Sequence, residues 1–313
     1  MKIKPKKKFF RKMDVLETIM FIIITLYVFS MLLVLFYALL TSLKHFMDFE
    51  RGNKLFGLPS TDKQYQYNRP LVVFGMQFGN YLDVFTRFTV DASKAGGGVR
   101  PVYFVEMLWN SLLYSVAMSA GSILLQVMAA YACAKYDFKL KNFIYGFVIL
   151  NMTIPIVGTL ASKVDIATSL GLKGNLLGLM VLNCSYTGMY FLVFYGAFKS
   201  VSWGYAEAAQ IDGAGHLRIF VEIMVPLIRA TIFAVFILQF IAHYNEYYTP
   251  MIFWPDRPTI AYGLFMFQSN VETGVSAPLK CASALVSAIP MMALFIAFRN
   301  IIMGNVSVGG LKG

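Results

Sequence analysis

The sequence predicts an all-α membrane protein with six transmembrane helices and with both termini in the cytoplasm. Apolar residues make up 58% of the 313 residues and charged residues only 14%, a balance far from that of soluble domains. Several apolar runs reach the roughly 20 residues that a hydrocarbon core about 30 Å thick requires. The basic clusters also fall in segments that this topology places inside the cell, as the positive-inside rule requires.

The first span is expected over residues 18–41, after a basic cytoplasmic tail of residues 1–17. This run is too long for the core of a signal peptide, and no small-residue cleavage site follows it. Residues 42–106 mix charged, aromatic and turn residues and predict an external loop. Because structureless loops of this length are uncommon, short helices or a small hairpin are expected there. The loop either grips a partner or is a solvated excursion, and the sequence does not decide between these two readings.

The core, residues 107–303, is expected to hold five further spans at about 108–134, 143–160, 176–198, 223–244 and 281–303. Pro155 and Pro290 lie inside the third and sixth spans, where neighbouring helices satisfy the carbonyls that a proline frees. Residues 163–175 and 245–280 are predicted to be external, and residues 304–313 to form a cytoplasmic tail.

The net charge of +11 is concentrated in the N-terminal tail and in loops, which favours anionic lipid over nucleic acid as the partner of these cations. Histidines and cysteines are scattered, without the spacing of metal ligands: His45, His216, His243, Cys133, Cys184 and Cys281. The cysteines are interpreted as small apolar core residues. Phosphate-loop, metalloprotease and nucleophile-elbow motifs are missing from the sequence. We therefore expect no catalytic residue, no metal site and no cofactor bound by this chain.

A polar, glycine-broken segment separates the fourth and fifth spans, where residues 200–227 read SVSWGYAEAAQIDGAGHLRIFVEIMVPL. Ser202 is expected to cap a short helix that contains Glu207, and Gly213 and Gly215 to end it. A carboxylate near a helix N-terminus suits the helix dipole, and the paired alanines leave a smooth face that another protein can approach. The pattern predicts a helix, a sharp turn and a second helix, built for docking.

The spacing of Glu207-Ala208-Ala209 and Asp212-Gly213-Ala214, followed by Pro226, resembles the EAA signature of permease subunits of ATP-binding-cassette importers. The IDGA version and the C-terminal residues 309–313 resemble the carbohydrate, maltose-permease-like branch, and the resemblance covers residues 105–313. It implies a type I importer architecture in which residues 200–220 form a cytoplasmic coupling helix. The residues to which it assigns coupling to an ATPase are Glu207, Ala208, Ala209, Asp212, Gly213, Ala214 and Pro226. An ordinary solvated carboxylate is the alternative for Glu207.

Polar side chains recur at helical spacing on two predicted spans, and they suggest a substrate pathway. Amides and hydroxyls bond to sugar hydroxyls, and aromatic faces stack on sugar C–H surfaces. Because polar groups that face lipid cost several kcal/mol, these faces should point to a cavity or to another helix. The candidate pathway residues are Asn151, Asn183, Tyr186, Thr187, Tyr190, Gln239, His243, Asn245 and Glu246. The alternative is that they only hydrogen-bond between helices.

The resemblance implies one of two membrane subunits of an oligosaccharide importer in the bacterial cell membrane. Its expected partners are a second homologous permease, two ATPase subunits that hold ATP and Mg²⁺, an extracytoplasmic solute-binding protein and membrane lipid. Import of glycerol phosphate or another polar solute is the first alternative, which the absence of arginines from the central spans disfavours. A channel or carrier without an ATPase would require ionisable relay residues inside the spans, and only Glu222, Arg229 and Glu246 lie near the ends of the fifth.

Overall fold

The chain was analysed in a computed structural model, which describes residues 14–52, 56–62, 64, 71–93, 98–154, 158–269 and 275–306. The basic residues 2–12, Pro155 and the C-terminal residues 309–313 lie outside the described residues. The described chain is predominantly helical and forms two compact units. The first unit comprises residues 1–83 and 274–285, and the second comprises residues 84–273 and 286–313.

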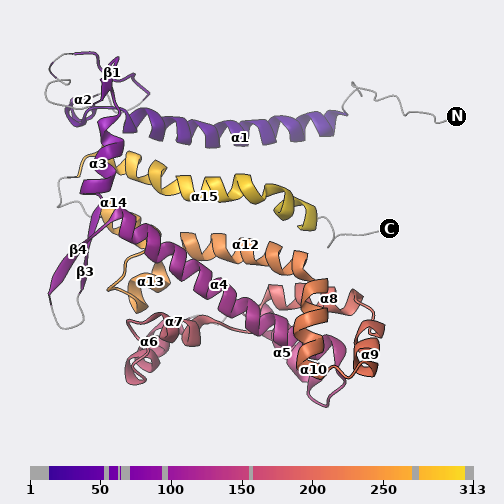
Figure 1. The fold of residues 1–313 in the computed structure, drawn as a ribbon. Coiled ribbons are helices and arrows are strands. Elements are labelled where there is room, and N and C mark those ends of the chain that lie inside the picture. The colour runs from indigo at the N-terminus through magenta and orange to yellow at the C-terminus, as the bar shows by residue number, and fades with distance from the viewer. Residues whose placement is uncertain are drawn as a thin grey trace. The chain divides into compact units, whose positions relative to one another are not determined.

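The elements follow one another along the chain as α1 (Val15–Ser42), α2 (Phe46–Glu50), β1 (Val72–Val73), β2 (Met76–Gln77), α3 (Gly79–Arg87), β3 (Thr89–Ser93), β4 (Val99–Tyr103), α4 (Phe104–Lys135), α5 (Lys141–Thr153), α6 (Leu160–Ser169), α7 (Leu176–Asn183), α8 (Met189–Ser200), α9 (Gly204–Ile211), α10 (His216–Arg218), the π-helix η2 (Ile219–Met224), α11 (Val225–Leu227), α12 (Arg229–Asn245), α13 (Tyr248–Phe253), α14 (Ile260–Ser269) and α15 (Ala277–Val306). Figure 1 shows this order by colour.

Three described helices are long and apolar enough to cross a membrane: α1, α4 and α15. A fourth candidate is the pair His216–Leu227 and Arg229–Asn245, which is bent by 76°. The predicted fourth span is divided into two shorter helices, α7 and α8. Helix α5 lies at the predicted third span, and α6 follows it, mostly within residues predicted as an external turn. The helical class is therefore confirmed, while the six-span topology and the cytoplasmic termini stay predictions.

The expected external loop of residues 42–106 is partly ordered, as its length predicted. It contains α2, α3 and two antiparallel hairpins, β1–β2 and β3–β4. Within the first unit, Asn80 fixes the chain after α1, because its Nδ2 donates to the carbonyls of Ser42 at 2.8 Å and Lys44 at 3.0 Å. The Ser42 hydroxyl also lies 2.7 Å from the Tyr81 hydroxyl. These contacts join α3 to the chain at the C-terminus of α1 and just after it.

Helix α4 is the centre of the second unit, and α8 and α12 pack along it. Gly121 of α4 also permits the close approach of the end of α7, because a Cβ there would lie only 2.8 Å from the Cys184 Sγ. Figure 1 shows α13, α14 and the β3–β4 hairpin near one end of α4, and α5, α9 and α10 near the other. We refer to these as the outer and inner ends, following the topology that the sequence predicts.

Candidate functional site

The predicted docking helix exists as α9 and is seated on the inner end of the second unit. Ala206 is completely buried and Ala209 is 8% exposed, and both belong to an apolar cluster with side chains of α4 and α8. Glu207 and Ala208 on the opposite side are exposed. The prediction that Ala208 and Ala209 together meet a partner is therefore wrong for Ala209. Successive residues lie about 100° apart around a helix, because one turn takes about 3.6 residues, so the second alanine faces the core.

The turn after α9 has the hydrogen bonds of a Schellman motif. The amide of Gly213 donates to the Gln210 carbonyl at 3.0 Å, and that of Ala214 to the Ala209 carbonyl at 2.9 Å. Gly213 has a φ of +83°, in the left-handed region that favours glycine. A Cβ at Gly213 would meet no atom within 4 Å. The requirement for glycine at this position is therefore conformational and not steric.

The remaining coupling candidates lie on either side of this turn. Asp212 caps the C-terminus of α9 and is exposed, whereas Ala214 is half-buried against the apolar cluster. Ser202 was expected to cap α9, but the N-cap is Trp203, without a side-chain capping bond; Ser202 accepts only from the Gly204 amide, at 3.3 Å. Pro226 lies in α11, directly after η2 and before the 76° bend. Because proline has no N–H, the helix loses one hydrogen bond there.

Four aromatic side chains attach the segment to α4, and sequence reasoning missed this role for all of them. The Tyr136 ring lies 5.8 Å from Trp203 and 5.7 Å from His216. The Tyr136 hydroxyl is 3.1 Å from the His216 Nδ1. The centre of the Tyr136 ring also lies 5.5 Å from that of the Tyr131 ring. Trp203 precedes α9 and His216 begins α10, so both sides of the docking segment rest on the last turns of α4.

The polar candidates of the fourth span were expected to share one helical face, and in the structure they do not. These are Asn183, Tyr186, Thr187 and Tyr190. Helix α7 ends at Asn183, α8 begins at Met189, and Gly188 between them has a φ of +128°. Tyr186 and Thr187 therefore lie in a non-helical segment. The hydroxyls of Ser185 and Thr187 are 2.8 Å apart, and the Ser185 Oγ also accepts from the Thr187 amide at 3.1 Å. Such local bonds compete with helix formation.

Asn151, Asn183, Tyr190 and Gln239 lie on four different helices. Asn183 turns back on α7, donating to the Leu179 carbonyl at 3.1 Å. Tyr190 is half-buried on α8 and Asn151 is half-buried near the end of α5. Gln239 is buried on α12, and its Nε2 donates to the Gln126 Oε1 of α4 at 3.0 Å. For Gln239 the structure favours the helix–helix alternative, and Gln126 is a partner that the sequence pattern did not reveal.

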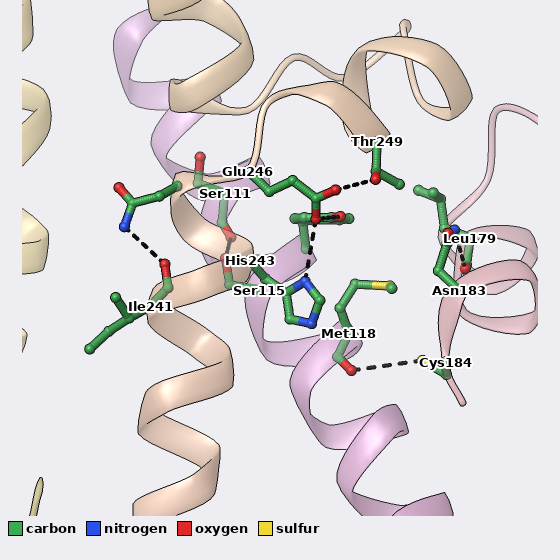
Figure 2. Close-up of polar contacts among 12 residues, drawn as sticks. Ser111, Ser115, Met118, Leu179, Asn183, Cys184, Ile241, His243, Glu246 and Thr249 are labelled. Atoms are coloured by element: carbon green, nitrogen blue, oxygen red, sulfur yellow. Dashed lines mark hydrogen bonds and ion pairs between the residues drawn. The ribbon is translucent and has the colours of Figure 1, made fainter. Parts of the chain in front are cut away.

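Glu246 and His243 come together at the outer end of α12. The His243 Nδ1 lies 3.5 Å from the Glu246 Oε2, and the same oxygen accepts from the Tyr114 hydroxyl at 3.1 Å. Thr249 donates to the Glu246 Oε1. Figure 2 shows this carboxylate between His243 and Thr249. The Asn245 Nδ2 donates instead to the Ile241 carbonyl, at 2.9 Å.

The outer end of α4 carries a second ion pair, outside the apolar part of the helix. Arg100 on β4 donates to the Glu106 carboxylate from its two terminal guanidinium nitrogens, from Nη1 to Oε2 at 3.0 Å and from Nη2 to Oε1 at 2.6 Å. The hydrogen bond to Glu106 raises the pKa of the Arg100 guanidinium. Among the described residues, no group of His, Cys, Asp and Glu side chains is placed to hold a metal ion.

Comparison with known proteins agrees with this arrangement. Residues 122–307, more than half of the chain, match the model of the family described as binding-protein-dependent transport system inner membrane component. The chain is 30% identical over 163 residues to the sn-glycerol-3-phosphate transport system permease protein UgpE of Yersinia pestis. That match covers 52% of this chain and 57% of the relative.

Two other relatives match over longer regions at lower identity. The sulfoquinovosyl glycerol transport system permease protein SmoH of Agrobacterium fabrum is 27% identical, with 66% of this chain and 73% of the relative covered. The diacetylchitobiose uptake system permease protein NgcG of Streptomyces coelicolor is 26% identical, with 65% and 68% covered.

A solved structure shows the same fold. One chain of a bacterial ABC transporter involved in the import of the acidic polysaccharide alginate superposes with a TM-score of 0.71 at 18% identity, covering 93% of this chain and 98% of that chain. The docking segment, the supporting residues Tyr131 and Tyr136, and α12 all lie within the region that the family model matches. This chain belongs to the family of inner-membrane components of binding-protein-dependent transport systems.

Proposed function

We propose that this chain is one of two membrane-spanning subunits of an ATP-driven importer for oligosaccharides in a bacterial cell membrane. In this proposal a second homologous permease completes the pathway, and two ATPase subunits hold ATP and Mg²⁺ on the cytoplasmic side. An extracytoplasmic solute-binding protein delivers the sugar. This chain binds no cofactor of its own; it converts movement of the ATPases into movement of helices.

The docking segment is the observation that carries this proposal. Its inner face is fixed to the helix bundle by Ala206 and Ala209, while Glu207, Ala208 and Asp212 are exposed. A short helix that is rigidly seated and polar on its outer side suits the transfer of force from another subunit. Ile211 beside them is 86% exposed, an apolar side chain that a groove in the ATPase would cover.

The division of the fourth span supports a polar pathway. Backbone that leaves the helical form at membrane depth is tolerated where it is buried in protein or lines a water-filled cavity. Ser185 and Tyr186, in the interruption between α7 and α8, are exposed in this chain. Their hydroxyls and the neighbouring carbonyls are the groups that a polyhydroxylated solute would bond.

Glycerol phosphate is the second candidate, and the 30% identity to UgpE is the observation that favours it. A phosphate needs cationic partners inside the pathway. In α4, α5, α8 and α12 the lysines and arginines stand at helix ends: Lys135, Lys141, Lys199 and Arg229. The described middle parts of these helices offer amides and hydroxyls, which suit neutral sugars better.

The experiment is reconstitution of the chain with its partner permease, ATPase and binding protein in lipid nanodiscs. ATP hydrolysis is expected to rise when the binding protein is loaded with an oligosaccharide, and not with the empty binding protein. Stimulation by glycerol phosphate alone would move the assignment to the second candidate. Solute flux through the chain without an ATPase would replace the importer by a channel or carrier.

A further inference from the structure

We propose that Glu246 is the positioning residue of an outer latch that joins α13 to both α4 and α12. The proposal rests on the proposed function, since it explains how an event at the outer surface reaches the transmembrane helices. The latch consists of Glu246, Tyr114, His243 and Thr249. The partners of the Glu246 carboxylate all lie in this chain, and these contacts assign to it a mechanical role.

Each donor to the Glu246 carboxylate comes from a different element. Tyr114 lies on α4 and donates to Oε2 at 3.1 Å. His243 lies one turn earlier on α12, with its Nδ1 3.5 Å from the same oxygen. Thr249 lies on α13 and donates to Oε1. Figure 2 shows the carboxylate end of Glu246 turned toward His243 and Thr249. One side chain thus ties three elements together.

The surroundings make this junction stiff. Tyr114 is completely buried, and its ring lies 6.0 Å from that of His243 and 6.4 Å from that of Trp254. Trp254 and Phe253, at the end of α13, are 3% and 2% exposed and share an apolar cluster with Tyr114. The Phe253 carbonyl also accepts from the Gly174 amide at 2.8 Å. Movement of α13 therefore requires rearrangement around Tyr114.

A carboxylate joins helices more selectively than an apolar contact does. A partly buried charge is stable only while its hydrogen bonds are made, so loss of the Thr249 donor disfavours the whole arrangement. The outer segment around α13 therefore has a preferred docked position, and displacement from it acts on α4 and α12 together. A binding protein that engages this outer segment would shift that balance.

Two variants test the latch, and the chain provides a matched control. Tyr114→Phe and Thr249→Val each remove one hydroxyl that bonds to Glu246 and keep the shape of the side chain. Tyr244→Phe also removes a hydroxyl from the same bundle, but the buried Tyr244 hydroxyl has no hydrogen-bond partner in the described structure. In the reconstituted complex the two latch variants are expected to reduce stimulation by the loaded binding protein about tenfold, the scale of one hydrogen bond to a charged group. The basal ATPase rate should be unchanged, and Tyr244→Phe should behave as the wild type.

A second measurement decides the proposal even if the complex shows no stimulation. Hydrogen exchange of the backbone amides of residues 248–254, in the full chain in nanodiscs, should be about tenfold faster in Tyr114→Phe than in the wild type or in Tyr244→Phe. Equal exchange in the three proteins would overturn the latch. So would equal stimulation of Tyr114→Phe and wild type, or an equal loss in all variants. Absence of stimulation in the wild type would overturn the proposed function and leave the exchange result to judge the latch.

Discussion

Replacing Gly213 by alanine tests the coupling segment at its turn. The φ of +83° costs a residue with a Cβ about 1–2 kcal/mol, and no steric term is added because a Cβ there meets no atom within 4 Å. If docking requires the turn, this cost corresponds to about a 5–30-fold loss in the docked population. Gly215 is the matched control, because its φ of −73° suits any residue and a Cβ there is also free of contacts.

The measurement is sugar-stimulated ATP hydrolysis in the reconstituted complex, together with affinity of the ATPase for the permease. Gly213→Ala should lower both within that range, and Gly215→Ala should lower neither. Gly213→Asn should fall between them, since asparagine tolerates the left-handed region. Gly213→Pro should be worse than alanine, because it also removes the amide that donates to Gln210 at 3.0 Å. Equal activities of the alanine variants at the two glycines would refute the reasoning.

Three further predictions use the same protein. Gln126→Leu or Gln239→Leu alone should destabilise the chain by about 1–3 kcal/mol in thermal unfolding, because one buried amide loses its partner; the double variant should recover most of the loss, and a double variant no better than the singles would contradict the pair. Ala206→Leu should destabilise by about 1–3 kcal/mol through overpacking, whereas Ala208→Leu should leave unfolding unchanged but weaken ATPase binding; the reverse pattern would mean that α9 is seated by its other face. In a background lacking the native cysteines, a cysteine in place of Tyr186 should react with a membrane-impermeant thiol reagent and be protected by sugar, and unchanged labelling with sugar would argue against a pathway there.

The sequence predicted the features that depend on local chemistry. The helical membrane class follows from composition, and the docking segment follows from Ser202, Glu207 and Gly213 at spacings that specify a cap, a helix and a left-handed stop. The structure confirmed the helix and its turn within the described residues. Ala209 was misassigned because the motif gives residue types and not the face that the core covers.

The interruption of the fourth span between α7 and α8 was not predicted, because a hydropathy profile averages over the whole apolar run. Residues 176–198 are apolar enough to read as one helix, yet the hydroxyls of Ser185 and Thr187 bond locally and Gly188 takes a positive φ. The pairing of Gln126 with Gln239 was also out of reach. These residues are 113 positions apart, and nothing in either helix alone identifies the other as its partner.

Helix α4 joins the two ends at which the chain meets other subunits in our proposal. Tyr131 and Tyr136 support the docking segment at its inner end, and Tyr114 holds the Glu246 carboxylate at its outer end. Tyr114 and Tyr131 are 17 positions apart, which is about 26 Å along a helix. Because α4 is a continuous helix over this length, a tilt imposed at one end must displace the other. Spin labels at the two ends of α4 should therefore keep a constant separation while both move relative to α8 during ATP turnover; a change in their separation would show that the helix bends and that the ends act independently.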